Sequence, residues 1–172
     1  AAVWLQREYG VPIVRSLPLG DVGRAGWQSE VFAALDLPLE NVGVGQLVKD
    51  VRTDKVLIIA DPIAAAAIAC LLRAHGFCNI HSAAYAWGEE TAVLYRQSSD
   101  ADVLVFRTAA DLQAVCNAAD TVIVDPALVP AMGEKHLVPL PSGLLSGRNA
   151  AGEGSGVLGA NFTSALERFL KQ

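Results

Sequence analysis

The feature that most constrains the fold is the strand-like run KVLIIA at 55–60, apolar at every position after Lys55, which leads directly into Asp61 and Pro62. Such a run is typical of a strand that is covered on both faces, as in parallel sheets. Asp followed by Pro is the pair expected at a helix start, where Asp caps the first turn and Pro takes the first helical position. We therefore expect a strand followed by an Ala-rich helix that reaches His75 and ends at Gly76.

The same alternation of strand and helix continues to the end of the chain. Further strand-like runs lie at 78–83, 102–106, 121–124 and 136–139. Helices are predicted at 88–97, at 109–118 with Thr108 as N-cap, and at 157–170. Apolar strands that alternate with helices predict an α/β fold, namely a Rossmann-like open parallel sheet with helices on both faces in three layers.

The first third of the chain has a less regular pattern. It suggests the end of a helix stopped by Gly10, a short strand at 11–14 (VPIV), and a second helix that begins at Gly20. We interpret 1–54 as the incomplete tail of a preceding α/β domain plus linking helices, and 55–172 as a Rossmann-like C-terminal domain. The chain has no initial Met, so we expect it to be a piece of a longer protein.

Composition excludes several classes of protein. With 52% hydrophobic residues and 18% charged residues, the chain has enough apolar material for a packed core. A net charge of −5 without a basic cluster disfavours binding to nucleic acid or to an anionic membrane. The longest apolar run, at 63–72, is too short to span a bilayer.

The cysteines and histidines indicate no metal site. Three cysteines, Cys70, Cys78 and Cys116, form neither a disulfide framework nor a CxxC metal knuckle. Their spacing indicates reduced thiols in a cytoplasmic protein. The three histidines are far apart in sequence, and none has a carboxylate at a metal-binding spacing.

Candidate binding residues follow the strands, because ligands of open α/β sheets bind beyond the strands' carboxyl ends. Asp61 and Asp125 occupy such positions, where the simpler role is that of a helix N-cap. In PSGLLSGR, Ser142 and Ser146 precede Arg148, the only cation of that loop and the best single candidate for an anionic ligand.

Glycine patterns give no support for a nucleotide site. The first strand–helix turn contains no glycine, and no Walker lysine motif occurs in the chain. The glycine-rich stretch at 152–159 precedes the last helix, whereas a dinucleotide fingerprint should follow the first strand. A mobile loop with one close helix contact is the simpler interpretation of this stretch. A receiver-like signalling domain is disfavoured because the strand at 102–106 separates Asp61 from Asp125.

Four stretches together resemble the C-terminal third of a nitrogenase component 1 subunit. They are LQREYGVPIVRSLPLG, LIIADPIAAAAIACLLRAHGF, DLQAVCNAADTVIVDP and PLPSGLLSGRNAAGEGSGVLGANFTSALERFL, in the order that the family has. The family also holds the protochlorophyllide reductase subunits and cofactor-assembly scaffolds. The ungapped match of the last loop puts Pro141 where the catalytic members have a metal-binding His. A beta-type, scaffold or nitrogenase-like reductase subunit therefore fits better than a nitrogen-reducing one.

The resemblance implies a redox function for a larger complex. An ATP-dependent iron–sulfur reductase would deliver electrons to a cluster shared by two homologous subunits, with no cluster ligand in this fragment. The fragment itself would be inactive and would form one wall of a substrate or cofactor cavity through Asp61, Ser142, Gly143 and Arg148. The alternative is a stand-alone Rossmann-like domain that binds a small ligand or a partner without redox activity.

Overall fold

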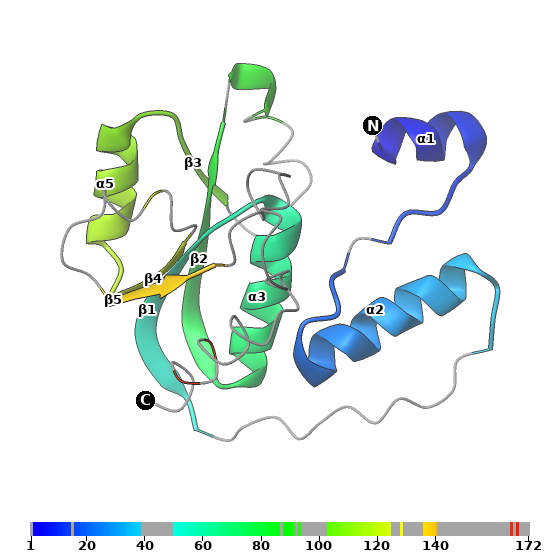
Figure 1. The fold of residues 1–172 in the computed structure, drawn as a ribbon, viewed down its shortest axis with the longest axis horizontal. Coiled ribbons are helices and arrows are strands. Elements are labelled where there is room, and N and C mark those ends of the chain that lie inside the picture. The colour runs from blue at the N-terminus through cyan, green and yellow to red at the C-terminus, as the bar shows by residue number, and fades with distance from the viewer. Residues whose placement is uncertain are drawn as a thin grey trace, which may run out of the picture.

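Five strands of the computed structural model form one sheet, in which all paired strands are parallel (Figure 1). The structure describes residues 2–14, 16–38, 50–86, 88–91, 93, 103–124, 128, 136–140, 166 and 168. Its helices and strands are, in chain order, α1 (Ala2–Tyr9), α2 (Gly20–Ala34), β1 (Arg52–Ile59), α3 (Pro62–Ala74), β2 (Phe77–Tyr85), β3 (Val103–Phe106), α5 (Ala109–Asn117), β4 (Thr121–Val124) and β5 (His136–Pro139).

The strand order is β3-β2-β1-β4-β5, with β1 at the centre. β1 pairs with β2 on one side, with Ile59 opposite Ala83, and with β4 on the other, with Ile59 opposite Val124. The chain adds β2 and β3 on one side of β1 and then adds β4 and β5 on the other. This order confirms the predicted α/β fold with a Rossmann-like open sheet.

Helices cover both faces of the sheet, with α3 on one side and α5 on the other (Figure 1). Along β1, Val56 and Ile58 belong to the cluster that contains the α3 residues, whereas Leu57 and Ile59 belong to the cluster that contains the α5 residues. All four side chains are at most 2% exposed. Burial on both faces explains why β1 reads as an uninterrupted apolar run rather than an alternating one.

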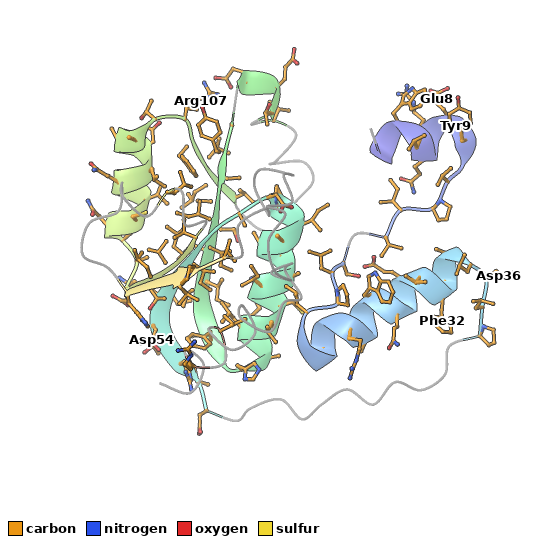
Figure 2. The ribbon with its side chains drawn as sticks, in the orientation of Figure 1. Glu8, Tyr9, Phe32, Asp36, Asp54 and Arg107 are labelled. Atoms are coloured by element: carbon orange, nitrogen blue, oxygen red, sulfur yellow. The ribbon has the colours of Figure 1, made fainter. Side chains whose placement is uncertain are left out.

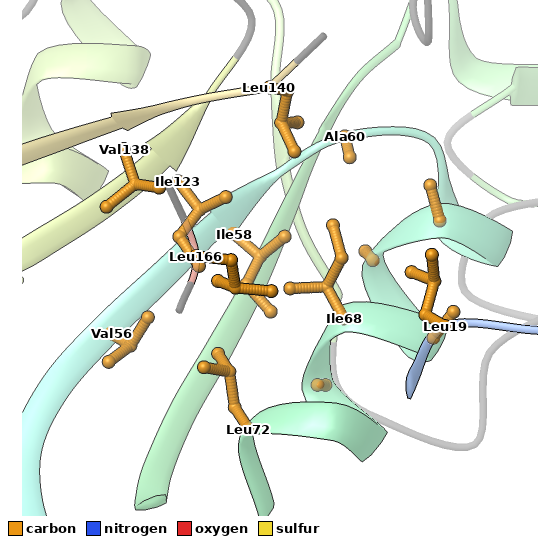
Figure 3. Close-up of a cluster of buried hydrophobic side chains, with 14 of the residues drawn as sticks. Leu19, Val56, Ile58, Ala60, Ile68, Leu72, Ile123, Val138, Leu140 and Leu166 are labelled. Atoms are coloured by element: carbon orange, nitrogen blue, oxygen red, sulfur yellow. The ribbon is translucent and has the colours of Figure 1, made fainter. Parts of the chain in front are cut away.

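Counted over the described residues, the cluster on the α3 side, drawn in Figure 3, is the larger of the two buried clusters. In it Ile68 and Leu72 of α3 lie near Ile58 of β1, and Leu19, which precedes α2, lies beside α3. Leu166 also belongs to this cluster and is helical. Of the predicted helix at 157–170, only Leu166 and Arg168 lie within the described residues, and both are helical.

The end of α3 depends on a glycine. His75 is the C-cap, and Gly76 follows with a φ of 88°, a left-handed conformation that glycine adopts without strain. A Cβ at this position would also collide with the carbonyl oxygen of Asp50. The tight turn brings the chain from α3 directly into β2, and the Arg52 N–H donates to the Gly76 carbonyl at 2.8 Å.

The predicted element boundaries differ from the observed ones mainly at strand ends. β1 begins at Arg52 rather than at residue 55, because the ladder with β2 already starts with Arg52 opposite Phe77. These first strand residues lie outside the buried layer, so hydrophobicity does not reveal them. Of the predicted helix at 88–97, residues 89–91 and 93 are helical. Residues 92 and 94–97 lie outside the described part of the chain.

We call residues 2–38 the N-terminal arm and the described residues from 50 to 140 the α/β body. The arm holds α1 and α2, and α1 lies apart from the sheet in Figure 1. Gly10 ends α1 as predicted, with a φ of 66° and an N–H that donates to the Gln6 carbonyl at 2.9 Å. α2 begins at Gly20, also as predicted. No described helix is long and apolar enough to cross a membrane.

The predicted strand at 11–14 is wrong. Residues 11–14 have no strand pairing, and the five-stranded sheet contains none of them. A strand is stable only when its N–H and C=O groups pair with a neighbouring strand, and Pro12 has no N–H to offer. The apolar composition of the segment indicated the conformation that it would take beside a partner, but the described residues provide no partner strand.

Candidate functional site

The carboxyl edge of the sheet is where the architecture would place a ligand. The order of the strands reverses between β1 and β4, so the connections that leave these two strands run in opposite directions. In open α/β sheets the crevice at this reversal is the usual binding position. Ala60 and Asp61 follow β1 at this point, next to the end of β4 at Val124.

Asp61 is held at this edge as the N-cap of α3, which confirms the prediction from the Asp-Pro pair. Its Oδ1 accepts hydrogen bonds from the backbone N–H groups of Ile63 at 3.0 Å and Ala64 at 3.1 Å. Its carbonyl accepts from the Ala65 N–H at 2.9 Å, and Pro62 has no N–H. Asp61 therefore provides the hydrogen-bond acceptors for the backbone N–H groups in the first turn of α3.

This self-capping determines what the start of α3 can bind. A phosphate at a helix N-terminus needs free backbone N–H groups, and Asp61 already occupies those of Ile63 and Ala64. The carboxylate would also repel an anion. In the described part of the chain both side-chain hydrogen bonds of Asp61 use Oδ1, so Oδ2 is the atom that could accept a hydrogen bond from a ligand.

The structure places one of the four predicted wall residues. Asp61 is half-buried at the carboxyl edge. Ser142, Gly143 and Arg148 lie outside the described residues, as does Asp125. Whether these residues lie near Asp61 therefore stays a prediction. The strand that leads toward the first three, β5, ends at Pro139, and Leu140 after it is buried.

Arg107 lies at the same edge and is not among the binding residues predicted from the sequence. It directly follows β3. Asp54 lies near the start of β1, and Figure 2 shows Arg107 at the opposite end of the sheet from Asp54. Its Nη2 lies 2.6 Å from Oε1 of Glu89, and both side chains are exposed. Among the described residues that directly follow a strand, Arg107 is the only Arg or Lys. Its position after a strand was the available signal, but its partner Glu89 could not be identified from sequence.

The next residues form a capping box that fixes the chain after β3. The Thr108 Oγ1 accepts from the Asp111 N–H at 3.1 Å, and the Asp111 Oδ2 accepts from the N–H groups of Thr108 at 3.1 Å and Arg107 at 3.2 Å. The contact with the Thr108 side chain, followed by these two backbone hydrogen bonds, lowers the pKa of Asp111 below the ordinary value of an aspartate. The predicted N-cap at Thr108 is confirmed.

Cysteine and histidine side chains are dispersed over the described part of the fold. Cys116 is buried in the cluster on the α5 side, whereas Cys70 and Cys78 are exposed. His81 lies 3.0 Å from the Asn79 Oδ1, and His136 lies 3.4 Å from the Thr121 Oγ1. Among the described residues, no three His, Cys, Asp or Glu side chains gather into a group that could hold a metal ion.

Comparisons of the chain with protein-family models, with curated proteins and with solved structures found no match. The class of the protein, a Rossmann-like α/β fold, therefore rests on the strand order and on the two helical layers. The resemblance of the four sequence stretches to a particular family stays an expectation from the sequence.

Proposed function

We propose that the chain is part of a nitrogenase component 1-like oxidoreductase subunit and forms one wall of a substrate or cofactor cavity. The observation that carries this proposal is the reversal of strand order between β1 and β4, with Asp61 at its carboxyl edge. The reversal supports a ligand-binding role for this edge. The family itself is supported by the four sequence stretches in their family order.

Asp61 would contribute a hydrogen-bond acceptor to this wall. Its Oδ1 is committed to the first turn of α3, which holds the carboxylate in a defined position. Its Oδ2 would then accept from a hydroxyl, amide or ammonium group of the bound molecule. Ser142, Gly143 and Arg148 would complete the wall, with Arg148 as the cation for an anionic group.

The N-terminal arm supports a place for the chain in a larger assembly. Trp4, Tyr9 and Leu35 are each more than half exposed. α1 has eight residues, and a helix of that length is marginal in water without packing against other elements. We infer that the arm packs against further α/β structure, either a preceding domain of the same subunit or the homologous subunit of a hetero-oligomer.

The described residues do not fit an iron–sulfur cluster, which needs several grouped thiolates. Cys116 is a buried residue of α5, and the two exposed cysteines are on different elements, with Cys70 in α3 and Cys78 in β2. A cluster and its electron transfer from an ATP-dependent iron–sulfur reductase would therefore belong to other parts of the complex. No chemical step is assigned to this chain.

The same carboxyl edge also favours a second candidate function, a Rossmann-like module that binds a small ligand or a partner without redox activity. The reversal between β1 and β4 supports ligand binding regardless of any cluster. The two proposals differ in what must accompany the chain. The first requires cluster-binding cysteines elsewhere in the complex, whereas the second requires none.

The deciding experiment is to determine the native reading frame around this chain and to purify its full product without oxygen. For the oxidoreductase subunit we expect spaced cysteines outside residues 1–172, bound iron, and an electron paramagnetic resonance signal that changes on reduction. Residues 1–172 produced alone serve as the control and should be colourless. A full-length product with neither iron nor a homologous partner would contradict the first proposal and leave the binding module.

A further inference from the structure

We draw no further inference here: the strongest candidate, the exposed apolar surface of α1 and of the residues that follow α2 (Trp4, Leu5, Tyr9, Leu35 and Leu37), already serves the proposed function as a contact surface, and nothing in the structure shows what covers it.

Discussion

The α/β body and the N-terminal arm differ in how far their apolar side chains are buried. In the body, Val56 and Ile58 of β1 are fully buried, because β1 is the central strand and lies between two helical layers. In the arm, Tyr9 is 68% exposed and Leu35 is 61% exposed. Both regions contain similar apolar residues, so amino-acid composition alone does not predict which region forms a buried core.

The difference lies in the contacts that each region makes. In the body, each strand has a parallel partner. Among the described residues, the arm meets the body where Leu17 packs against the cluster on the α3 side, Leu19 is buried beside α3, and Gly20 approaches Leu71. A Cβ on Gly20 would lie 2.6 Å from the Leu71 Cδ1. The body is therefore stabilised by its own contacts, whereas several large apolar side chains of the arm, such as Trp4, Tyr9 and Leu35, are exposed in the described structure.

The largest expected contrast between the two regions comes from truncating one buried and one exposed aliphatic side chain. Ile58→Ala should lower the free energy of unfolding by about 4 kcal/mol, because it opens a cavity beside a fully buried strand. Leu35→Ala should change it by less than about 0.5 kcal/mol, since Leu35 is largely exposed. Urea denaturation of both variants checks this. Equal losses would show that the arm is packed in solution as tightly as the body.

Two glycines should give changes of opposite sign. Gly76→Ala should destabilise the protein by about 2–3 kcal/mol, because alanine is strained at a φ of 88° and its Cβ collides with the Asp50 carbonyl. Gly26→Ala, inside α2 with no atom close to the new Cβ, should stabilise it by about 0.5–1 kcal/mol. The denaturation midpoints of the two variants measure this. A loss at both positions would indicate that a partner surface lies against Gly26.

A smaller change is expected at the N-cap of α3. Asp61→Ala should cost about 1 kcal/mol, because the N–H groups of Ile63 and Ala64 lose their acceptor. Asp61→Asn keeps an acceptor oxygen and should leave stability close to that of the wild type. The pair separates the structural role of Asp61 from its proposed role in the wall. An unchanged midpoint in Asp61→Ala would show that Asp61 does not cap α3 in solution.

The smallest expected effect is a pH dependence at the start of α5. The pKa of Asp111 is lowered in the folded state, so its ionised form stabilises the fold at pH values above the unfolded pKa of about 4. That contribution should be lost as the pH falls through the lowered folded pKa. Thermal unfolding between pH 6 and the acid limit measures it. Asp111→Asn should reduce the acid sensitivity, and an identical pH profile would contradict the assignment.

The core of the fold was predictable because a strand that is buried on both faces has apolar residues at consecutive positions in the sequence. β4 and β5 have the predicted bounds, and Asp61, Thr108 and Gly76 mark the helix ends where expected. These signals are local, since each depends on residues within one turn of the chain. The first residues of β1 escaped prediction because their side chains are not buried, although their backbone is paired.

The features that could not be predicted depend on distant partners. Residues 11–14 have the composition of a strand, but a strand exists only beside another strand. Arg107 pairs with Glu89 of the preceding connection, and no spacing rule identifies such a contact. For the candidate site, the sequence predicted the position and capping role of Asp61. The location of Ser142, Gly143 and Arg148 relative to it stays a prediction.

The central position of β1 has a consequence for how the chain assembles. β1 reaches β2 through a single helix, but it reaches β4 only after a much longer stretch of chain, and Lys55 and Asp120 at that seam are 65 residues apart. Closing the longer loop costs more entropy, so we expect the β1–α3–β2 unit to form first and to act as the template on which β4 docks. A mutation that weakens the pairing of β1 with β2 should then slow refolding. A mutation that weakens the pairing of β1 with β4 should mainly speed unfolding.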